Sequence, residues 1–321
     1  MSSTCLYCDK SIIMREDIMN DSTANNQCIL GHVQTSRGSI AVKALNDVFV
    51  NYMFSQEENN EILRSLVNIL IDDLRSRYVG TSVSPVRGDI TVETQYAHLK
   101  AGTPRRQDAK IIGDDITYVE FQSISYPPEP IRLRAVEYFT LSLSTDMKGG
   151  EKVVRQIWVL SKDVEELMHG STYANYVWMD EITHSRYPAD YGMLFVCLGE
   201  LEKDHRSKAG ELAAFLLGKA DKAKHREVAD IVDAYNASFE KFREDKEAVT
   251  LMSYTEEREA IGEAKGKAIG IEETNAKTAL KMLAKGMDMD DIEDITGLSS
   301  EAILAMQKKA ADEQSDSIIQ A

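Results

Sequence analysis

Apolar side chains recur at helical spacing in the first third of the chain. After Ser55 they lie three or four residues apart, at Ile62, Leu66, Ile69, Leu70 and Leu74. Acidic residues stand in the first turn of this stretch, where they interact favourably with the positive end of a helix. The pattern predicts an amphipathic helix, and residues 131–147, which follow Pro130, predict a second one.

Strand patterns lie between and after these two helices. Residues 106–112 and 116–122 are strand-length and rich in β-formers, and the Gly-Asp-Asp sequence at 113–115 suits a turn, so together they predict a β-hairpin. Three later stretches are further candidate strands: residues 153–160, 176–182 and 193–201. Helix, hairpin, helix and strands in this order predict an α/β domain over residues 41–243.

The flanking regions have different patterns. Residues 1–40 are polar and irregular and predict a poorly ordered N-terminal arm. Residues 244–286 are rich in Ala, Glu and Lys and predict a linker helix. Residues 287–321 predict a small helical tail, in which Gly297 ends one helix and Ser299 or Ser300 begins the next.

Glycines repeat every four residues in the linker helix, at Gly262, Gly266 and Gly270, interleaved with alanines. This small-residue face permits the close approach of a partner helix and so favours a homodimer. The alternative is a flexible connector, because each glycine weakens a helix by about 1 kcal/mol. The pattern leaves both interpretations open.

Composition limits the class of protein. No apolar run reaches the roughly 18 residues of a membrane span, and the first residues lack the basic start and apolar core of a secretory leader. Four cysteines are too few for a disulfide scaffold in 321 residues. We therefore expect a cytoplasmic protein without a membrane partner.

The predicted hairpin brings two carboxylates together. If its turn is centred on Asp114, Asp108 lies opposite Glu120, with the two β-carbons roughly 5 Å apart. Carboxylates this close repel unless a cation lies between them, and oxygen ligands on strands suit Mg²⁺ or Mn²⁺. The alternative is a solvated polar face of an edge hairpin, with Asp108 paired to Arg106 or Lys110.

The motifs around this pair occur in a series that is typical of one family. Asp108 is followed by Glu120-x-Gln122, and the next predicted helix carries Arg134-x-x-x-Tyr138. The chain resembles the PD-(D/E)xK nuclease superfamily, and within it the bacterial recombination-promoting nuclease and transposase-like family. The similarity continues through residues 46–54, 57–70, 193–203, 282–286 and 295–299.

The resemblance implies a fold and an activity. The fold is an α/β restriction-endonuclease-like core (helix, β-hairpin, helix and further strands) followed by a helical C-terminal extension. The activity is that of a Mg²⁺- or Mn²⁺-dependent endodeoxyribonuclease, a hydrolase that cleaves phosphodiester bonds in DNA.

The resemblance also implies roles for individual residues. Asp108 and Glu120 would be the metal ligands, and Gln122 stands where the superfamily has its catalytic Lys. A neutral Gln can only hydrogen-bond, so more of the electrostatic stabilisation would come from the metal. Glu61 matches the position of a further acidic group, and the alternative is a solvent-exposed helix glutamate.

Arg134 and Tyr138 lie one helical turn apart and suit contact with a DNA phosphate near the metal. The alternative is a core Tyr beside an Arg that caps a carboxylate. The family often has a Lys four residues after Asp47, where this chain has Asn51. We expect Asn51 to lie apart from the metal ligands. Residues 1–40 have no counterpart in the family.

The net charge of −16 opposes DNA binding, because phosphate contacts need Lys and Arg. Residues 84–134 are nevertheless neutral, with seven basic and seven acidic side chains. Arg105 and Arg106 precede the hairpin and, with Arg134, are the expected DNA-binding cations. We expect modest DNA binding, or DNA binding helped by oligomerisation.

Three other kinds of site are relevant to the function: a zinc site, a nucleotide-binding loop and a catalytic nucleophile. Cys5, Cys8, Cys28 and His32 have the ligand types and spacing of a structural zinc site, and the alternative is a set of reduced thiols on a loose arm. Cys197 lies in an apolar run and is expected in the core. The sequence has no glycine-rich phosphate loop and no serine or cysteine nucleophile signature, which argues against an NTPase and against those hydrolases.

Two functions therefore stay open. The first is a metal-dependent DNA endonuclease of the transposase-like, recombination-promoting kind. The second is a catalytically inactive DNA-binding or interaction protein that retains the nuclease fold. The complete Asp108, Glu120 and Gln122 set favours the enzyme, whereas Asn51 and the acidic charge favour the inactive protein.

Overall fold

The structure is a computed structural model that describes residues 29–35, 38–94, 108–123, 131–146, 152–186 and 191–308. The chain divides into two compact units. Of the described residues, unit 1 holds 29–34 and 39–245, and unit 2 holds 246–308 together with Thr35 and Gly38. The fold class is mixed α/β, as the sequence predicts at that level.

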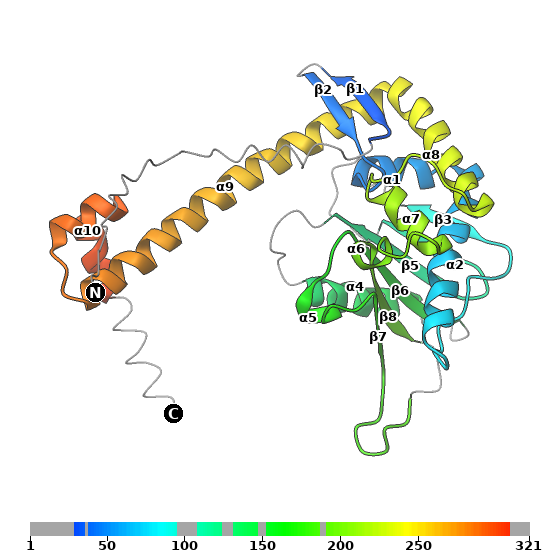
Figure 1. Ribbon diagram of the computed structural model, residues 1–321, viewed down its shortest axis with the longest axis horizontal. Helices are drawn as coiled ribbons and strands as arrows, with labels where there is room; N and C mark the ends of the chain where they lie inside the picture. Colours follow the sequence, from blue (N-terminus) through cyan, green and yellow to red (C-terminus); the bar gives the residue numbers. More distant parts are fainter. Residues whose placement is uncertain are drawn as a thin grey trace, which may run out of the picture. The chain divides into compact units, whose positions relative to one another are not determined.

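Unit 1 is built on a six-stranded mixed sheet with the strand order β3-β4-β5-β6-β8-β7 (Figure 1). Its strands are β3 (Thr91–Thr94), β4 (Ala109–Ile112), β5 (Ile116–Gln122), β6 (Val154–Leu160), β7 (Tyr173–Val177) and β8 (Gly192–Cys197). β5, β6 and β8 run parallel, and the outer pairings are antiparallel. Every residue of β6 is buried, because helices cover both faces of the sheet.

The helices of unit 1 form two layers (Figure 1). They are α1 (Asp47–Phe54), the 3-10 turn η1 (Glu57–Asn59), α2 (Asn60–Arg77), α4 (Ile131–Asp146), α5 (Glu165–Met168), α6 (Leu198–Leu201), α7 (Lys208–Leu216) and α8 (Arg226–Glu244). α4 and α5 cover one face of the sheet, where Ile131 and Ala135 share a buried cluster with Trp158 of β6. On the opposite face, Phe54 of α1 stacks on Phe121 of β5 at a centroid distance of 6.0 Å, and α8 packs against α1 and α2.

The two amphipathic helices and the hairpin that the sequence predicts are confirmed as α2, α4 and the β4–β5 pair. α1 is a helix that the spacing pattern does not predict. Its sequence is apolar on nearly every side, and all of its positions after Asp47 are buried. Asn46 caps it, accepting a hydrogen bond from the Phe49 N–H at 3.1 Å. A helix without a polar face has no period for a sequence pattern to detect.

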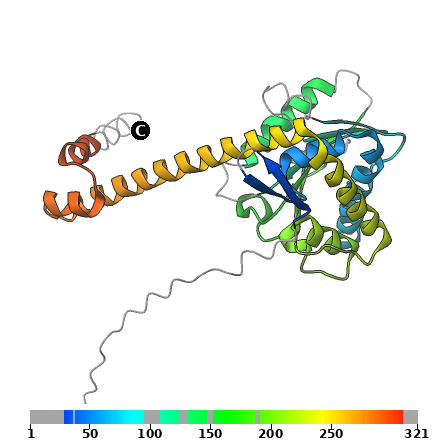
Figure 2. The same cartoon turned by 90° about the horizontal axis from the view of Figure 1, so that it is seen from above.

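Three sequence-based assignments are wrong in part. Within the expected N-terminal arm, β1 (Gly31–Thr35) and β2 (Gly38–Val42) form a two-stranded ribbon, visible in blue in Figure 2. Its buried apolar residues, Val33 and Val42, are too sparse to mark strands in the sequence. The predicted strand over 193–201 ends at Cys197, because Leu198 and Leu201 are buried by one helical turn, α6. β7 begins and ends earlier than the predicted strand over 176–182.

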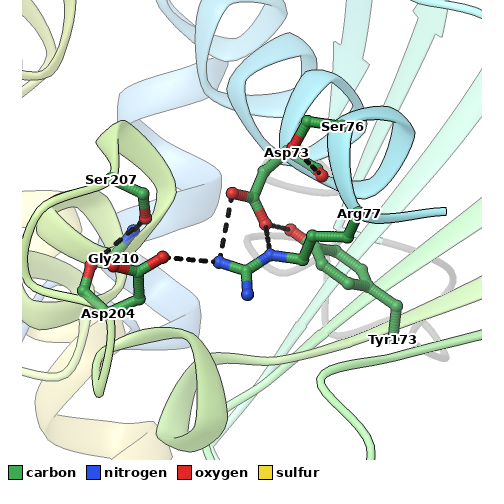
Figure 3. Close-up of polar contacts among 7 residues, drawn as sticks. All are labelled: Asp73, Ser76, Arg77, Tyr173, Asp204, Ser207 and Gly210. Carbon is green, nitrogen blue, oxygen red and sulfur yellow. Dashed lines mark hydrogen bonds and ion pairs between the residues drawn. The ribbon is translucent and has the colours of Figure 1, made fainter.

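A polar network fastens the C-terminal end of α2 to the edge of the sheet (Figure 3). Asp73 of α2 accepts hydrogen bonds from the Tyr173 hydroxyl of β7 at 2.8 Å and from Arg77 at 2.6 Å. Arg77 also forms an ion pair at 2.9 Å with Asp204, which lies in the segment before α7. Ser207, in the same segment, caps the N-terminus of α7. The network joins three segments that are far apart in the sequence.

Unit 2 consists of α9 (Lys246–Ala284), α10 (Met289–Thr296) and a helix over residues 300–308. Its small core consists of Ala279, Ile292 and Ile303, surrounded by Met282, Leu283, Met289 and Leu298. Gly297 ends α10 with a φ of 68°, and Ser299 caps the following helix, as the sequence predicts. Within the described ranges of the chain, no helix is long and apolar enough to cross a membrane.

Candidate functional site

The β4–β5 hairpin has the register that the sequence predicts. Ala109 pairs with Val119, and the same register, continued by one residue beyond the start of β4, sets Asp108 opposite Glu120. The Asp108 N–H donates to Glu120 Oε2 at 3.2 Å, so the two residues are in contact. Both are buried, with 9% of Asp108 and 8% of Glu120 exposed. We call these two buried residues, Asp108 and Glu120, the opposed carboxylate pair.

The alternative of a solvated edge hairpin is wrong. β5 lies between β4 and β6 in the interior of the sheet, and each of its residues except Gln122 is buried. Lys110, one of the two cations considered for Asp108, pairs with Asp146 of α4 at 2.8 Å. The other, Arg106, lies outside the described residues, as does Arg105, so their expected DNA contacts have no structural counterpart here.

Asp108 is held by two donors. Asn51 Nδ2 donates to Oδ1 at 3.0 Å, and the Phe121 N–H donates to Oδ2 at 2.8 Å. The expectation that Asn51 lies apart from the carboxylate pair is thus wrong. The buried helix α1 brings it there, and the same Asn51 amide also donates to the Asp47 carbonyl at 3.0 Å, one helical turn earlier.

Glu120 is in contact with α4. Arg134 donates to Glu120 Oε1 at 3.3 Å and also to the side-chain oxygen of Gln122. Burial raises the pKa of Glu120 well above its ordinary value, and the negative charge of Asp108 raises it further, while Arg134 acts in the opposite direction. Burial and the charge of Asp108 thus favour the neutral form of Glu120 more than in an exposed carboxylate.

The guanidinium of Arg134 lies near the rings of both Tyr138 and Trp158. The guanidinium carbon of Arg134 lies 5.2 Å from the centroid of the Trp158 ring and 5.8 Å from that of Tyr138. The two rings are 6.0 Å apart. Burial raises the pKa of Tyr138. These contacts match the alternative considered for the pair, in which an Arg caps a carboxylate beside a packed Tyr.

Glu61 does not join this group. Its side chain is 59% exposed and forms an ion pair with Arg64, one turn further along α2. After burial and Asp108, the negative charge of Asp47 on α1 is a smaller contribution to the raised pKa of Glu120. The spacing of Asp47 and Asn51, four residues apart on one helix face, is the sequence signal for this arrangement.

The pair offers the ligand chemistry of a hard divalent cation. Asp108 and Glu120 supply carboxylate oxygens, and Mg²⁺ typically takes only one or two protein carboxylates. No group of three or more His, Cys, Asp or Glu side chains suited to a metal occurs among the described residues.

The zinc hypothesis is not open to a structural test. Cys5, Cys8 and Cys28 lie outside the described residues, and His32 lies on β1. Cys197 is fully buried, as expected, and burial raises the pKa of its thiol. No protein-family model, curated protein or solved structure matches this chain.

Proposed function

We propose that the protein is a metal-dependent endodeoxyribonuclease, a hydrolase of phosphodiester bonds in DNA. The observation that carries the proposal is the pair of buried, opposed carboxylates, Asp108 and Glu120, on an interior hairpin of the sheet. Burying two acids side by side destabilises a fold, and such sites occur where a protein binds a cation or moves protons.

The arrangement of the neighbouring elements supports this proposal. A helix, a hairpin with the two acids, a second helix and a parallel strand follow one another as α2, β4–β5, α4 and β6. The motif series that resembles the recombination-promoting, transposase-like nucleases of the PD-(D/E)xK superfamily falls on these elements. We extend the proposal to the fold, a restriction-endonuclease-like core with a helical extension, and to DNA as the partner.

Each residue has a proposed part in the reaction. Mg²⁺ or Mn²⁺, when bound, supplies Lewis-acid activation of water and stabilisation of the leaving oxygen. Asp108 and Glu120 hold it, and Asn51 and the Phe121 N–H keep the Asp108 carboxylate oriented. Gln122 orients a water through its side-chain amide, in the position where the superfamily has Lys.

A second function, an inactive DNA-binding or interaction protein with the same fold, is favoured by one observation. All four oxygens of the carboxylate pair already have donors within the chain: Asn51, the Phe121 N–H, the Asp108 N–H and Arg134. A protein that never binds metal would need such internal satisfaction.

Nicking of supercoiled plasmid separates the two functions. The full chain is assayed with Mg²⁺, with Mn²⁺ and with EDTA, beside Asp108→Asn and Glu120→Gln, which remove one negative charge at nearly constant shape. We expect wild-type nicking only with metal, and a loss of at least about a hundredfold in each variant. Asp146→Asn is the matched control, because Asp146 binds Lys110 and Tyr118 on the same sheet face without touching the pair. Metal-independent or absent nicking by the wild type contradicts the enzyme.

A further inference from the structure

The guanidinium group of Arg134 lies against the carboxylate pair. It donates to Glu120 Oε1 at 3.3 Å and to the side-chain oxygen of Gln122. The other Glu120 oxygen, Oε2, already accepts the Asp108 N–H. Arg134 thus engages the one carboxylate oxygen of Glu120 that the hairpin backbone leaves available, and with it the Gln122 amide oxygen beside it on β5.

Aromatic rings contact Arg134 in this position, but part of its side chain remains exposed to solvent. The guanidinium lies 5.2 Å from the ring centroid of Trp158 and 5.8 Å from that of Tyr138, while 39% of the Arg134 side chain is exposed. Its Nε is buried and has no hydrogen-bond partner within the described ranges of the chain. A buried donor left unsatisfied costs free energy, so this pose leaves one of the five N–H donors of Arg134 unused.

We infer that Arg134 is an internal counter-ion which occupies the carboxylate pair until a divalent cation displaces it. This inference rests on the proposed function, from which it takes the metal and the phosphodiester. A divalent cation and a guanidinium compete for the same Glu120 oxygen, and their like charges repel. Released from Glu120 and Gln122, the planar fork of Arg134 matches the oxygens of a DNA phosphate, for which Arg is the best-suited side chain.

This exchange unites the two interpretations that the sequence leaves open for Arg134. In the metal-free protein it caps a carboxylate, and in the metal-bound protein it contacts the substrate. At low metal concentration, the guanidinium of Arg134 therefore blocks the carboxylate pair. A purely structural cap, by contrast, would stay on Glu120 and leave metal affinity unchanged when removed.

Mn²⁺ binding by calorimetry, with the full chain and no DNA, tests the exchange. Arg134→Met keeps an unbranched stem over Trp158 and removes the guanidinium. We expect it to bind Mn²⁺ about threefold to tenfold more tightly than the wild type, the range for a charge-assisted hydrogen bond in a partly exposed pair. Arg132→Met is the matched control, because it removes a positive charge from an exposed position on the same helix. We expect it to change the affinity less than about twofold.

Trp158 provides a second readout. The chain has two tryptophans, Trp158 with 0% exposure and Trp178 with 52%. In a Trp178→Phe background, emission reports on Trp158 alone. We expect Mg²⁺ to change this emission, because a cation leaves the face of the ring, and we expect the change to be lost when Arg134→Met is added.

The outcomes are distinct. Equal Mn²⁺ affinity in wild type and Arg134→Met, or metal binding without a change in Trp158 emission, overturns the exchange and leaves the proposed nuclease standing. Absence of metal binding in the wild type and both variants overturns both. If Arg134→Met does not fold, Arg134→Gln replaces it, because Gln also removes the positive charge but keeps a polar side chain. Arg134→Gln must then bind Mn²⁺ more tightly than the wild type, and equal affinity overturns the exchange.

Discussion

At the residue scale, Asp108 and Glu120 illustrate how burial changes the chemistry of a carboxylate. Each acid has protein donors, two on Asp108 and two on Glu120, yet the pKa of Glu120 stays well above its ordinary value because burial and Asp108 outweigh Arg134. The site therefore gives up stability in the metal-free protein, as functional sites commonly do.

The pH dependence of stability follows from Glu120. Its folded-state pKa lies above the ordinary value of 4.5, so the folded chain holds the proton more tightly than the unfolded chain. The contribution of Glu120 to the free energy of unfolding is full below the unfolded pKa and is lost as the pH rises through the folded pKa. In urea unfolding with EDTA, we expect the wild type to lose stability relative to Glu120→Gln as the pH rises from about 4 to about 8. Parallel profiles would contradict a raised folded-state pKa of Glu120.

Asn51 is the second residue whose role is testable by stability. Asn51→Ala removes a buried donor from Asp108 and from the Asp47 carbonyl, and we expect a loss of about 1 to 3 kcal/mol in the free energy of unfolding. We also expect slower plasmid nicking, because the Asp108 carboxylate is no longer oriented. Asn59 is the matched control, since it is equally buried and donates to the Met53 carbonyl at 2.8 Å. Asn59→Ala should cost similar stability and leave nicking unchanged, and equal effects on nicking would make Asn51 merely structural.

At the element scale, the sheet and its two helix layers decide which side chains meet. β5 alternates between faces, so Glu120 and Gln122 meet α4 while Phe121 meets α1. From the other helix layer, α1 reaches Asp108 through Asn51. The candidate site therefore has contacts from two helices in opposite layers. The network of Figure 3 separately fastens α2 to the sheet edge.

That network gives a prediction for the attachment of α2. Tyr173→Phe removes one hydrogen bond to Asp73 but leaves Arg77 in place, so we expect a loss of about 0.5 to 1.5 kcal/mol in the free energy of unfolding. Asp73→Ala leaves the buried Tyr173 hydroxyl without its acceptor and should cost more. A double-mutant cycle measures the coupling, and a coupling near zero would contradict the network. Tyr78→Phe, at an exposed tyrosine beside Tyr173, is the control and should stay within about 0.5 kcal/mol.

At the scale of the whole molecule, the two units carry different chemistry. The described residues of the candidate site all belong to unit 1, and unit 2 contributes a long helix and a small helical core. The net charge of −16 opposes the approach of DNA, so we propose that any DNA complex depends on local cations and on self-association through α9.

The glycine face of α9 tests this self-association. A β-carbon at Gly262, Gly266 or Gly270 would meet nothing within 4 Å, so the triple Gly→Ala variant creates no clash within the chain. It should raise the helicity of α9, because each alanine is favoured over glycine by about 1 kcal/mol. If two copies pack through this face, the added methyl groups keep their backbones apart. We expect sedimentation to show a dimer for the wild type and weaker association for the variant. A monomeric wild type, or an unaffected dimer, would leave α9 as a connector.

The sequence by itself determined the parts of this protein that depend on local order. Apolar spacing defined α2 and α4, and the Gly-Asp-Asp turn fixed the register of the hairpin, since one residue of slip would move every side chain to the other face. That register is sufficient to place Asp108 opposite Glu120, so the core of the candidate site was predictable. The C-terminal end of α10 and the start of the next helix were predictable for the same reason, because caps act within a few residues.

Only the tertiary structure decided which other side chains surround the pair. Asn51 lies 57 residues before Asp108 in the sequence. Its spacing from Asp47 places both side chains on one face of α1, but no local pattern shows which distant group that face meets. Glu61, on a helix of clear period, points to solvent instead because the packing of α2 turns that position outward. The neighbours of a buried group are set by how whole elements pack, and that packing depends on contacts between residues that are distant along the chain.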